Sequence, residues 1–343
     1  MRVGIVLDGR RTADEVADLA KLAEDCGLRQ LWLSGGARTK DHFLRLAVAA
    51  TRTTAIQLGP VAISPFEAHP ARIAIELLTL HEIARGRAAI VIGGGGDFAA
   101  TLGVPLEGRV AAVEETIAIT RAMARGGEVS HRGARFAVHG LFSPWTGVAP
   151  PPLHVGANRP RMIAMAARQA DGVMFTDMPL GRLAALVAQV RTGLAEAGRD
   201  AGGFAISNWF VWNVQETREE AFALARRQLG FRLYYIRDVA AAIGIGDAEA
   251  RELARRQPEM LRAIFAGGQP WVPPAPLAER LIRHLTLSGG REDLDGCVAR
   301  LREFERAGLT EIALAPHGDP ARAIRLLGER VLPALGREAG GAR

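Results

Sequence analysis

The sequence predicts an α/β protein, a (β/α)8 TIM barrel with a helical insertion between strands 7 and 8. Short apolar runs alternate with segments of helical spacing eight times along the 343 residues. The runs are continuously apolar, as the strands of a parallel sheet are when helices cover them. The residues after the first run read LDGRRT and lack the GxGxxG pattern of an open nucleotide-binding sheet. A closed barrel is therefore favoured over an open sheet.

The first strand and helix show the pattern clearly. Residues 3–7 (VGIVL) form a short apolar run, and residues 12–26 carry apolar side chains at helical spacing. Thr12 suits the N-cap position, because Glu15 stands three residues further on, as in a capping box. Gly27 fits the end of the helix, so this segment is predicted to be one complete βα unit.

The same alternation predicts the remaining elements in order. Strands are expected at 30–34, 56–63, 88–93, 152–156, 172–176, 204–214 and 311–315. Helices are expected at 42–51, 70–84, 108–125, 160–169, 181–197, 217–229, 293–307 and 319–332. Trp209 and Trp212 lie three residues apart in one strand and are predicted to face opposite sides of it.

Two segments interrupt the alternation. Residues 128–150 form an excursion, and residues from about 230 to 290 form a largely helical, Arg-rich insertion. We expect a single barrel domain over residues 1–336 that contains this insertion, and a disordered tail at 337–343.

The composition limits the classes of protein to which the chain can belong. Hydrophobic residues make up 48% of it, and Gly and Pro are spread between apolar runs, so disorder is excluded. The net charge of +6 comes from scattered Arg residues, without the basic runs and interleaved aromatics of nucleic-acid-binding proteins. No apolar stretch reaches the roughly 18 residues of a membrane span. We expect a cytoplasmic protein that binds neither nucleic acid nor membrane.

The two cysteines are not expected to bind metal. Cys26 and Cys297 lie in helical patterns and have no metal-ligand spacing between them. No metal site is predicted.

A barrel of this kind carries its active site at the C-terminal ends of its strands. Gly93–Gly96 are four consecutive glycines after the fourth strand. Backbone without side chains can pass close beneath a flat or phosphorylated ligand, and a flexible turn is the alternative. The segment 59–65 (GPVAISP) places Pro60 inside a strand, which predicts a bulge or a strand end there.

The segment 156–161 (GANRPR) follows the fifth strand and opens a helix. Its backbone amides and the helix dipole favour an anion, which Asn158, Arg159 and Arg161 can reinforce. An ordinary capped turn is the alternative.

Four segments together resemble the bacterial-luciferase-like flavin and deazaflavin oxidoreductases, above all the methylenetetrahydromethanopterin reductase branch. They read LGPVAISPFEAHP (58–70), LHEIARGRAAIVIGGG (80–95), PPLHVGANRPRMIAMAARQADGVMF (151–175) and FERAGLTEIALAPHGD (304–319). The resemblance spans about residues 1–230 and 290–336. It implies a TIM barrel with an insertion, which agrees with the fold read from the residues.

The resemblance also implies where a cofactor binds. The ring of coenzyme F420, a deazaflavin with an acidic tail, or of FMN is expected against strand 3, where the family carries a non-prolyl cis peptide. By position this bond is Val61–Ala62 or its neighbour. The resulting set of cofactor-binding residues is Ser34, Val61, Ala62, Ile63, Gly93, Gly94, Gly95, Gly156, Ala157, Asn158 and Arg159, with the phosphate near the last four.

The sequence departs from the family at the positions whose side chains are expected to donate or accept protons. An Asp-His pair often follows strand 2, but here those positions are Gly35 and Gly36. His42 is a candidate for a displaced acid or base, with an exposed or capping role as the alternative. Asp97 is a candidate proton donor or ring contact, although Gly96 displaces it by one residue. His317 ends strand 8, where it is either a substrate contact or a structural loop residue.

Three functions remain open at this point. The first is an oxidoreductase that transfers hydride between coenzyme F420 and a small organic substrate. The second is an FMN-dependent monooxygenase, and the third is a barrel that binds a cofactor without turnover. Arg159 and Arg161 favour the deazaflavin because its tail is acidic. The resemblance also implies a homodimer.

Overall fold

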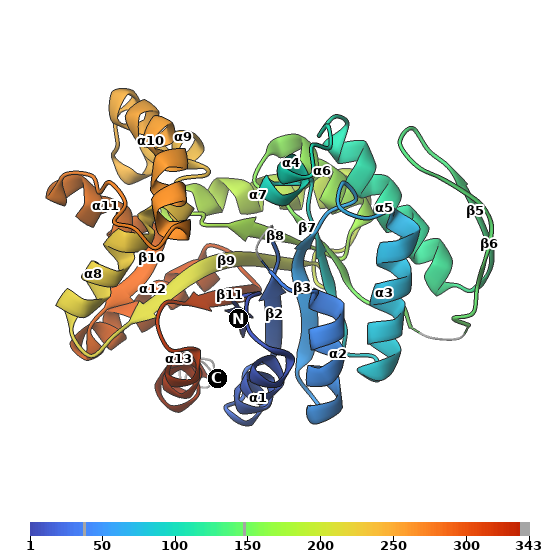
Figure 1. Ribbon diagram of the computed structural model, residues 1–343, viewed down its shortest axis with the longest axis horizontal. Coiled ribbons are helices and arrows are strands. Elements are labelled where there is room, and N and C mark those ends of the chain that lie inside the picture. Colours follow the sequence, from blue (N-terminus) through green and yellow to red (C-terminus); the bar gives the residue numbers. More distant parts are fainter. Residues whose placement is uncertain (37–38, 147–148, 337–343) are drawn as a thin grey trace.

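The computed structural model describes residues 1–36, 39–146 and 149–336, apart from the side chain of Asp97. Within these residues one sheet has the strand order β10-β9-β11-β1-β2-β3-β4-β7-β8, and β8 also pairs with β9. Eight parallel strands thereby close into a barrel, with β10 added outside the ring (Figure 1). The predicted (β/α)8 barrel is confirmed. Its strands are β1 (Arg2–Leu7), β2 (Gln30–Ser34), β3 (Gln57–Ile63), β4 (Ile90–Ile92), β7 (Leu153–Gly156), β8 (Gly172–Thr176), β9 (Ala205–Val214) and β11 (Glu311–Pro316).

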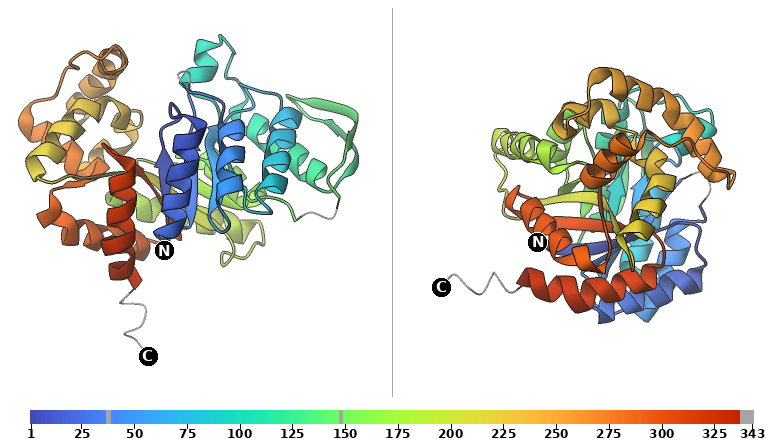
Figure 2. Two further views of the ribbon diagram at one scale, coloured as in Figure 1. Left: turned by 60° about the horizontal axis from the view of Figure 1, so that its bottom comes forward. Right: turned by 90° about the vertical axis from the view of Figure 1, so that its left-hand side faces the viewer.

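Helices cover the outside of the barrel, as the two views of Figure 2 show. They are α1 (Ala13–Asp25), α2 (His42–Arg52), α3 (Pro70–Ile83), α5 (Arg109–Ala124), α6 (Pro160–Gln169), α7 (Leu180–Glu196), α12 (Leu294–Arg306), α13 (Pro320–Leu326) and α14 (Leu332–Gly336). The predicted capping box of α1 is present, because the Thr12 hydroxyl accepts from the Glu15 amide and the Glu15 carboxylate accepts from the Thr12 amide.

Two segments add structure that the sequence pattern did not specify. The excursion holds an antiparallel hairpin of β5 (Gly127–Arg132) and β6 (Ala137–Ser143), which projects beside α3 and α5 (Figure 1). The insertion is mostly helical, as expected, but it ends in a strand, β10 (Thr286–Gly289), that pairs parallel to the second half of β9. The helix α8 (Arg218–Gln228) precedes the insertion at the place where a barrel helix is predicted, and a 3-10 turn at Leu229–Arg232 follows it. The helices of the insertion are α9 (Ile236–Val239), α10 (Asp247–Phe265) and α11 (Ala275–Leu285).

Side chains alternate between the two faces of the barrel wall. Val3, Ile5 and Leu7 of β1 belong to the large core between strands and helices, whereas Val6 packs inside the barrel. Trp209 packs inside and Trp212 packs outside, so the prediction that they face opposite sides is confirmed. Large aliphatic residues therefore fix the helices to the wall, and the interior is lined by residues of mixed size and polarity.

Nothing tests the expectation of a disordered tail, because residues 337–343 lie outside the described part of the chain. Among the described residues, no helix has the length and apolar character needed to cross a membrane.

Candidate active site at the barrel mouth

The C-terminal ends of β2, β3, β4 and β7 carry all the residues expected to bind a cofactor. β3 ends in an irregular stretch, where the pairing register with β4 shifts between Val61 and Ile63. The Val61–Ala62 peptide is cis, at the bond that the resemblance implied. The Gly35 amide donates to the Val61 carbonyl at 2.9 Å, and the Gly93 amide donates to the Ile63 carbonyl at 2.9 Å. These bonds hold the ends of the three strands together at the barrel mouth.

Glycines keep this part of the mouth free of side chains. A Cβ atom at Gly93 would lie 3.1 Å from the Ala62 Cβ, closer than side-chain atoms normally approach. Gly95 has a φ of 82°. A Cβ atom at Gly95 would lie 2.8 Å from the Leu106 side chain. The backbone at Gly93 therefore packs closely against Ala62, and we call the surface that these residues form the glycine platform. The close contacts and the positive φ favour a built surface over the flexible turn that was the alternative.

His42 returns to this platform although it stands seven residues after Gly35. Its Nε2–H donates to the Ser34 carbonyl at 3.0 Å, and a Cβ atom at Gly35 would lie 3.0 Å from Nε2. The imidazole thus occupies the space beside Gly35, where the family's Asp-His pair is missing. Burial lowers the pKa of His42, so the ring is neutral at physiological pH. Its catalytic role stays a prediction.

The start of α6 differs from the anion site that the sequence predicts, because one of the expected donors is not free. The Ala157 amide donates to the Met174 carbonyl at 3.1 Å, so it extends the sheet and is not free for an anion. The first helical hydrogen bond joins the Ile163 amide to the Arg159 carbonyl. The amides of Arg161 and Met162 therefore lack acceptors within the helix and are the donors that α6 can offer to a phosphate.

Asn158 has a structural task at this turn. Its side-chain oxygen accepts from the Thr176 amide at 3.0 Å, and its amide nitrogen donates to the Thr176 carbonyl at 3.2 Å. The side chain thereby joins the ends of β7 and β8. A hydrogen bond also joins it to the Tyr235 hydroxyl from the insertion. These contacts leave Asn158 less free to bind an anion than the sequence indicated.

The insertion contacts the mouth through charged side chains as well. Arg159 faces Asp238 of α9 at 3.5 Å. Arg232 forms a 2.5 Å ion pair with Asp177, which follows β8 with a φ of 55°. Sequence reasoning missed Arg232 and Tyr235, because no local motif connects an insertion to the strand ends beneath it, whereas the position of Asp177 at the end of a strand could be predicted.

His317 lies beside Arg232, and burial together with that charge lowers its pKa to about 3. The ring is therefore neutral at physiological pH. Its Nδ1 is buried without a hydrogen-bond partner among the described residues. A neutral hydrogen-bonding contact fits this environment better than proton transfer by the ring. The assignment of His317 to the site stays a prediction.

Two carboxylic acids, Asp97 and Glu67, are candidates for proton transfer near the ends of β3 and β4. Asp97 begins the short helix α4 (Asp97–Thr101), and its side chain lies outside the described structure. Glu67, which the sequence did not single out, follows β3 by four residues, and burial raises its pKa to about 7. The Glu67 amide donates to the Ser64 carbonyl at 3.0 Å, and a Cβ at Gly95 would lie 3.3 Å from the Ser64 hydroxyl. An acid within an otherwise apolar stretch, SPFEAH, was the available sequence signal.

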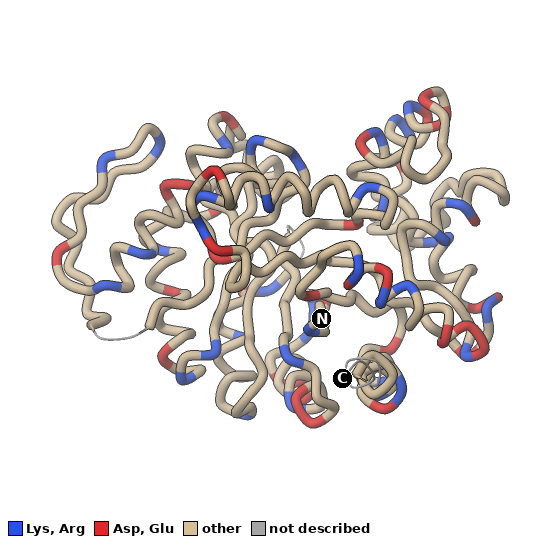
Figure 3. The backbone as a smooth tube through the Cα atoms, turned by 180° about the vertical axis from the view of Figure 1, so that it is seen from behind, with Lys and Arg blue, Asp and Glu red and all other residues tan. Residues whose placement is uncertain are grey.

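Charged residues of both signs are distributed over the molecule. Lys and Arg are spread among Asp and Glu over the chain, as Figure 3 shows. Among the residues described, no group of three His, Cys, Asp or Glu side chains is placed to hold a metal ion.

Comparisons with known proteins agree with the fold and show the family. The family model described as luciferase-like monooxygenase matches residues 1–311. A 5,10-methylenetetrahydromethanopterin reductase from Archaeoglobus fulgidus is 26% identical over 327 residues, which cover 94% of this chain and 96% of that protein.

Two solved structures share the fold. The coenzyme F420-dependent tetrahydromethanopterin reductase from Methanopyrus kandleri has a TM-score of 0.84 at 23% identity and covers 97% of this chain and 99% of its own. An F420-dependent secondary alcohol dehydrogenase has a TM-score of 0.78 at 16% identity and covers 97% and 98%.

Proposed function

The chain belongs to the luciferase-like monooxygenase family, and from this premise we propose that it is an oxidoreductase that transfers hydride between coenzyme F420 and a small organic substrate. The relatives similar over nearly the whole chain are named as methylenetetrahydromethanopterin reductases. Two solved structures with the same fold are named as F420-dependent. These names support F420 over FMN as the cofactor.

The glycine platform is the observation that carries the proposal. At Gly93 and Gly95 an added Cβ atom would meet the Ala62 and Leu106 side chains at 3.1 and 2.8 Å, so only the bare backbone of glycine fits here. A planar ring can lie against such a surface, and the free amides at the start of α6 can hold a phosphate. When bound, the deazaflavin supplies the carbon that gives or takes the hydride.

The side chains around the platform orient the ligands and hold protons. His42 donates through Nε2 to Ser34, which leaves Nδ1 as a hydrogen-bond acceptor. Glu67, with its pKa of about 7, can hold or release a proton near neutral pH. His317 contributes a neutral contact, and Asp97 remains a candidate proton donor.

Titration of the purified protein with F420 and with FMN, each oxidised and reduced, tests the proposal by fluorescence. We expect tight, saturable binding of F420 and weaker binding of FMN. The opposite preference would favour the FMN-dependent monooxygenase. Binding of F420 without hydride exchange to any member of a panel of methylene-pterins and secondary alcohols would instead support a non-catalytic barrel.

We also propose a cytoplasmic homodimer. Large apolar side chains are exposed on α2 and on the hairpin, at Leu44 (72%) and Phe142 (71%), which supports a subunit contact. Cys26 and Cys297 are both free thiols, which is typical of a reducing compartment. Light scattering coupled to gel filtration tests the dimer, and cell fractionation tests the location.

A further inference from the structure

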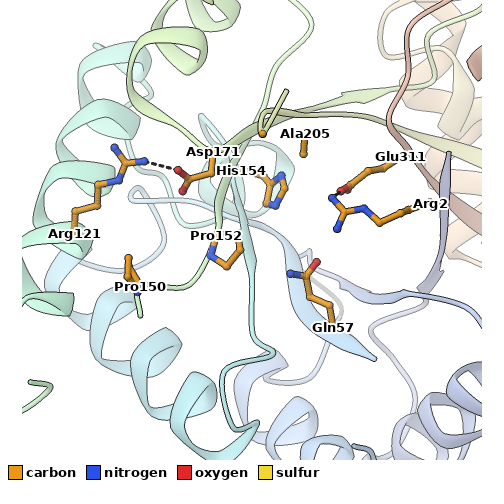
Figure 4. Close-up of a pocket in the computed structure, with 10 residues that line it drawn as sticks. Arg2, Gln57, Arg121, Pro150, Pro152, His154, Asp171, Ala205 and Glu311 are labelled. Atoms are coloured by element: carbon orange, nitrogen blue, oxygen red, sulfur yellow. Dashed lines mark hydrogen bonds and ion pairs between the residues drawn. The ribbon is translucent and has the colours of Figure 1, made fainter. Parts of the chain in front are cut away.

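A polar cavity lies at the end of the barrel opposite the mouth. Its volume is about 410 Å³, within the range of small-molecule pockets. The polar side chains around it are Arg2, Gln57, Arg121, His154, Asp171 and Glu311. They come from the N-terminal ends of several barrel strands and from α5, and Figure 4 shows Arg121 with Asp171 on one side of the cavity and Arg2 with Glu311 on the other. We call this cavity the basal pocket.

Buried polar groups form the floor of the basal pocket. The Glu311 residue is fully buried, and its carboxylate accepts from Arg2 and, at 2.8 Å, from the Gln30 amide. His154 is 3% exposed, and its Nδ1 has no partner among the described residues. Burial lowers the pKa of His154, so this ring is neutral. Apolar side chains of similar volume would fill the barrel at least as stably, so packing alone does not explain these residues.

The hydrogen bonds of the pocket leave donors unused. Both oxygens of Asp171 have partners, since Oδ1 accepts from Arg121 at 2.7 Å and Oδ2 accepts from the Leu153 amide at 2.9 Å. Both oxygens of Glu311 are occupied in the same way. Each guanidinium uses only Nη2, and its Nε and Nη1 have no partner within the described residues. The Gln57 amide oxygen accepts from Gln30, which leaves its NH2 group as a further donor.

The charged side chains of the basal pocket differ in how far a ligand can reach them. The side chains of Arg2 and Arg121 are 57% and 33% exposed. The Asp171 side chain is 40% exposed, but that of Glu311 is only 1% exposed and cannot touch a ligand appreciably. The two arginines and the two carboxylates balance in charge, but the unused guanidinium donors remain accessible, and they stand on opposite sides of the cavity.

We propose that the basal pocket binds a small organic dicarboxylate, with one carboxylate at Arg2 and the other at Arg121. Paired donors of a guanidinium match the two oxygens of a carboxylate, and two guanidinium groups on opposite walls select an anion with a charge at each end. The site is separate from the cofactor site at the mouth, and neither proposal depends on the other.

Calorimetric titration of the full chain with succinate at constant ionic strength tests the proposal. We expect saturable binding at millimolar concentration or below, and no binding of the neutral isostere succinamide. Arg121→Gln should weaken succinate binding about tenfold or more, because it removes charge-assisted bonds. Arg2→Lys keeps a cation beside Glu311, so the protein should still fold. Because lysine lacks the planar guanidinium donors, this variant should also weaken succinate binding.

Matched variants locate the site. Arg72→Gln removes an exposed arginine that pairs with Glu76 on α3 and should leave succinate binding unchanged. Arg159→Gln at the mouth should also leave it unchanged. Loss of binding in Arg159→Gln but not in Arg121→Gln would place the anion at the mouth and overturn the proposal. Absence of succinate binding at 10 mM, or binding of inorganic phosphate as tight as that of succinate, would overturn it too.

Discussion

At the scale of single residues, Glu67 gives the site a group that titrates near neutral pH. Its pKa in the folded protein is about 7, against an ordinary value of 4.5, because burial disfavours the charged form. The folded state therefore binds this proton more tightly than the unfolded state. The stabilisation is fully present below about pH 4.5 and is lost as the pH rises through 7.

Glu67→Gln should remove this dependence on pH. We expect the wild-type protein to lose stability relative to Glu67→Gln between pH 5 and pH 8, because only the wild type must bury a charge at the higher pH. Urea unfolding midpoints measured at each pH give the difference. A difference that stays constant from pH 5 to pH 8 would contradict a raised pKa for Glu67.

Gly93→Val should block the glycine platform. Its Cβ would lie 3.1 Å from the Ala62 Cβ, and the two added methyl groups would occupy the surface proposed for the ring. A contact overpacked in this way costs about 1 to 3 kcal/mol, so the Kd for F420 should rise about 5- to 150-fold.

Fluorescence titration measures the effect of Gly93→Val, with Gly96→Ala as the control in the same loop. No atom lies within 4 Å of a Cβ at Gly96, so this variant should bind as the wild type does. Equal F420 affinity in both variants would show that the ring does not lie at Gly93.

At the scale of the element, the start of α6 combines free amides with two arginines. Arg159 is held at 3.5 Å from Asp238, whereas no ion pair engages Arg161 within the described structure. Arg161 is therefore the freer of the two cations to bind a phosphate. Arg161→Ala should weaken binding of F420 or FMN about 10- to 100-fold, because a charge-assisted bond is worth about 1.5 to 3 kcal/mol.

Riboflavin, which lacks the phosphate, is the control ligand for Arg161→Ala. Its affinity should not change, and the loss for the phosphorylated cofactor should shrink as salt is raised. Arg159→Ala should have the smaller effect. If both variants bind the phosphorylated cofactor as tightly as the wild type, the side chains do not contact the phosphate.

At the scale of the whole molecule, the Asp177–Arg232 ion pair ties the insertion to the barrel. The side chains are 5% and 13% exposed, so neither charge has much access to water. Burial raises the pKa of Asp177, and the charge of Arg232 opposes this shift. Removing one partner would leave the other charged and buried.

Arg232→Met should lower the free energy of unfolding by about 3 to 5 kcal/mol. The double variant Asp177→Asn, Arg232→Met should recover much of this loss, because no charge then remains unpaired; asparagine also tolerates the positive φ at position 177. Urea unfolding measures both, with Arg255→Met on exposed α10 as a control that should change little. Equal stability of the single and double variants would show that the pair is not a unit.

The sequence by itself determined the wall of the barrel and the position of its mouth. Apolar runs with helices between them specify parallel strands, and in a barrel all C-terminal strand ends meet at one face. The glycines after β4 and the bulge in β3 could be predicted because they are local features of the backbone. The opposite orientations of Trp209 and Trp212 follow from the two-residue period of a strand in the same way.

The tertiary structure alone decided which side chains meet. Tyr235 reaches Asn158 and Arg232 reaches Asp177 only after the chain has closed into a barrel and the insertion has folded over it. The Ala157 amide looked free in the sequence, yet it bonds to Met174 on the neighbouring strand. Single polar residues from separate strands, among them Arg2, Gln57 and Glu311, form the basal pocket only when the ring is complete. Local patterns fix the direction of a side chain, whereas its partners depend on closure between residues distant in sequence.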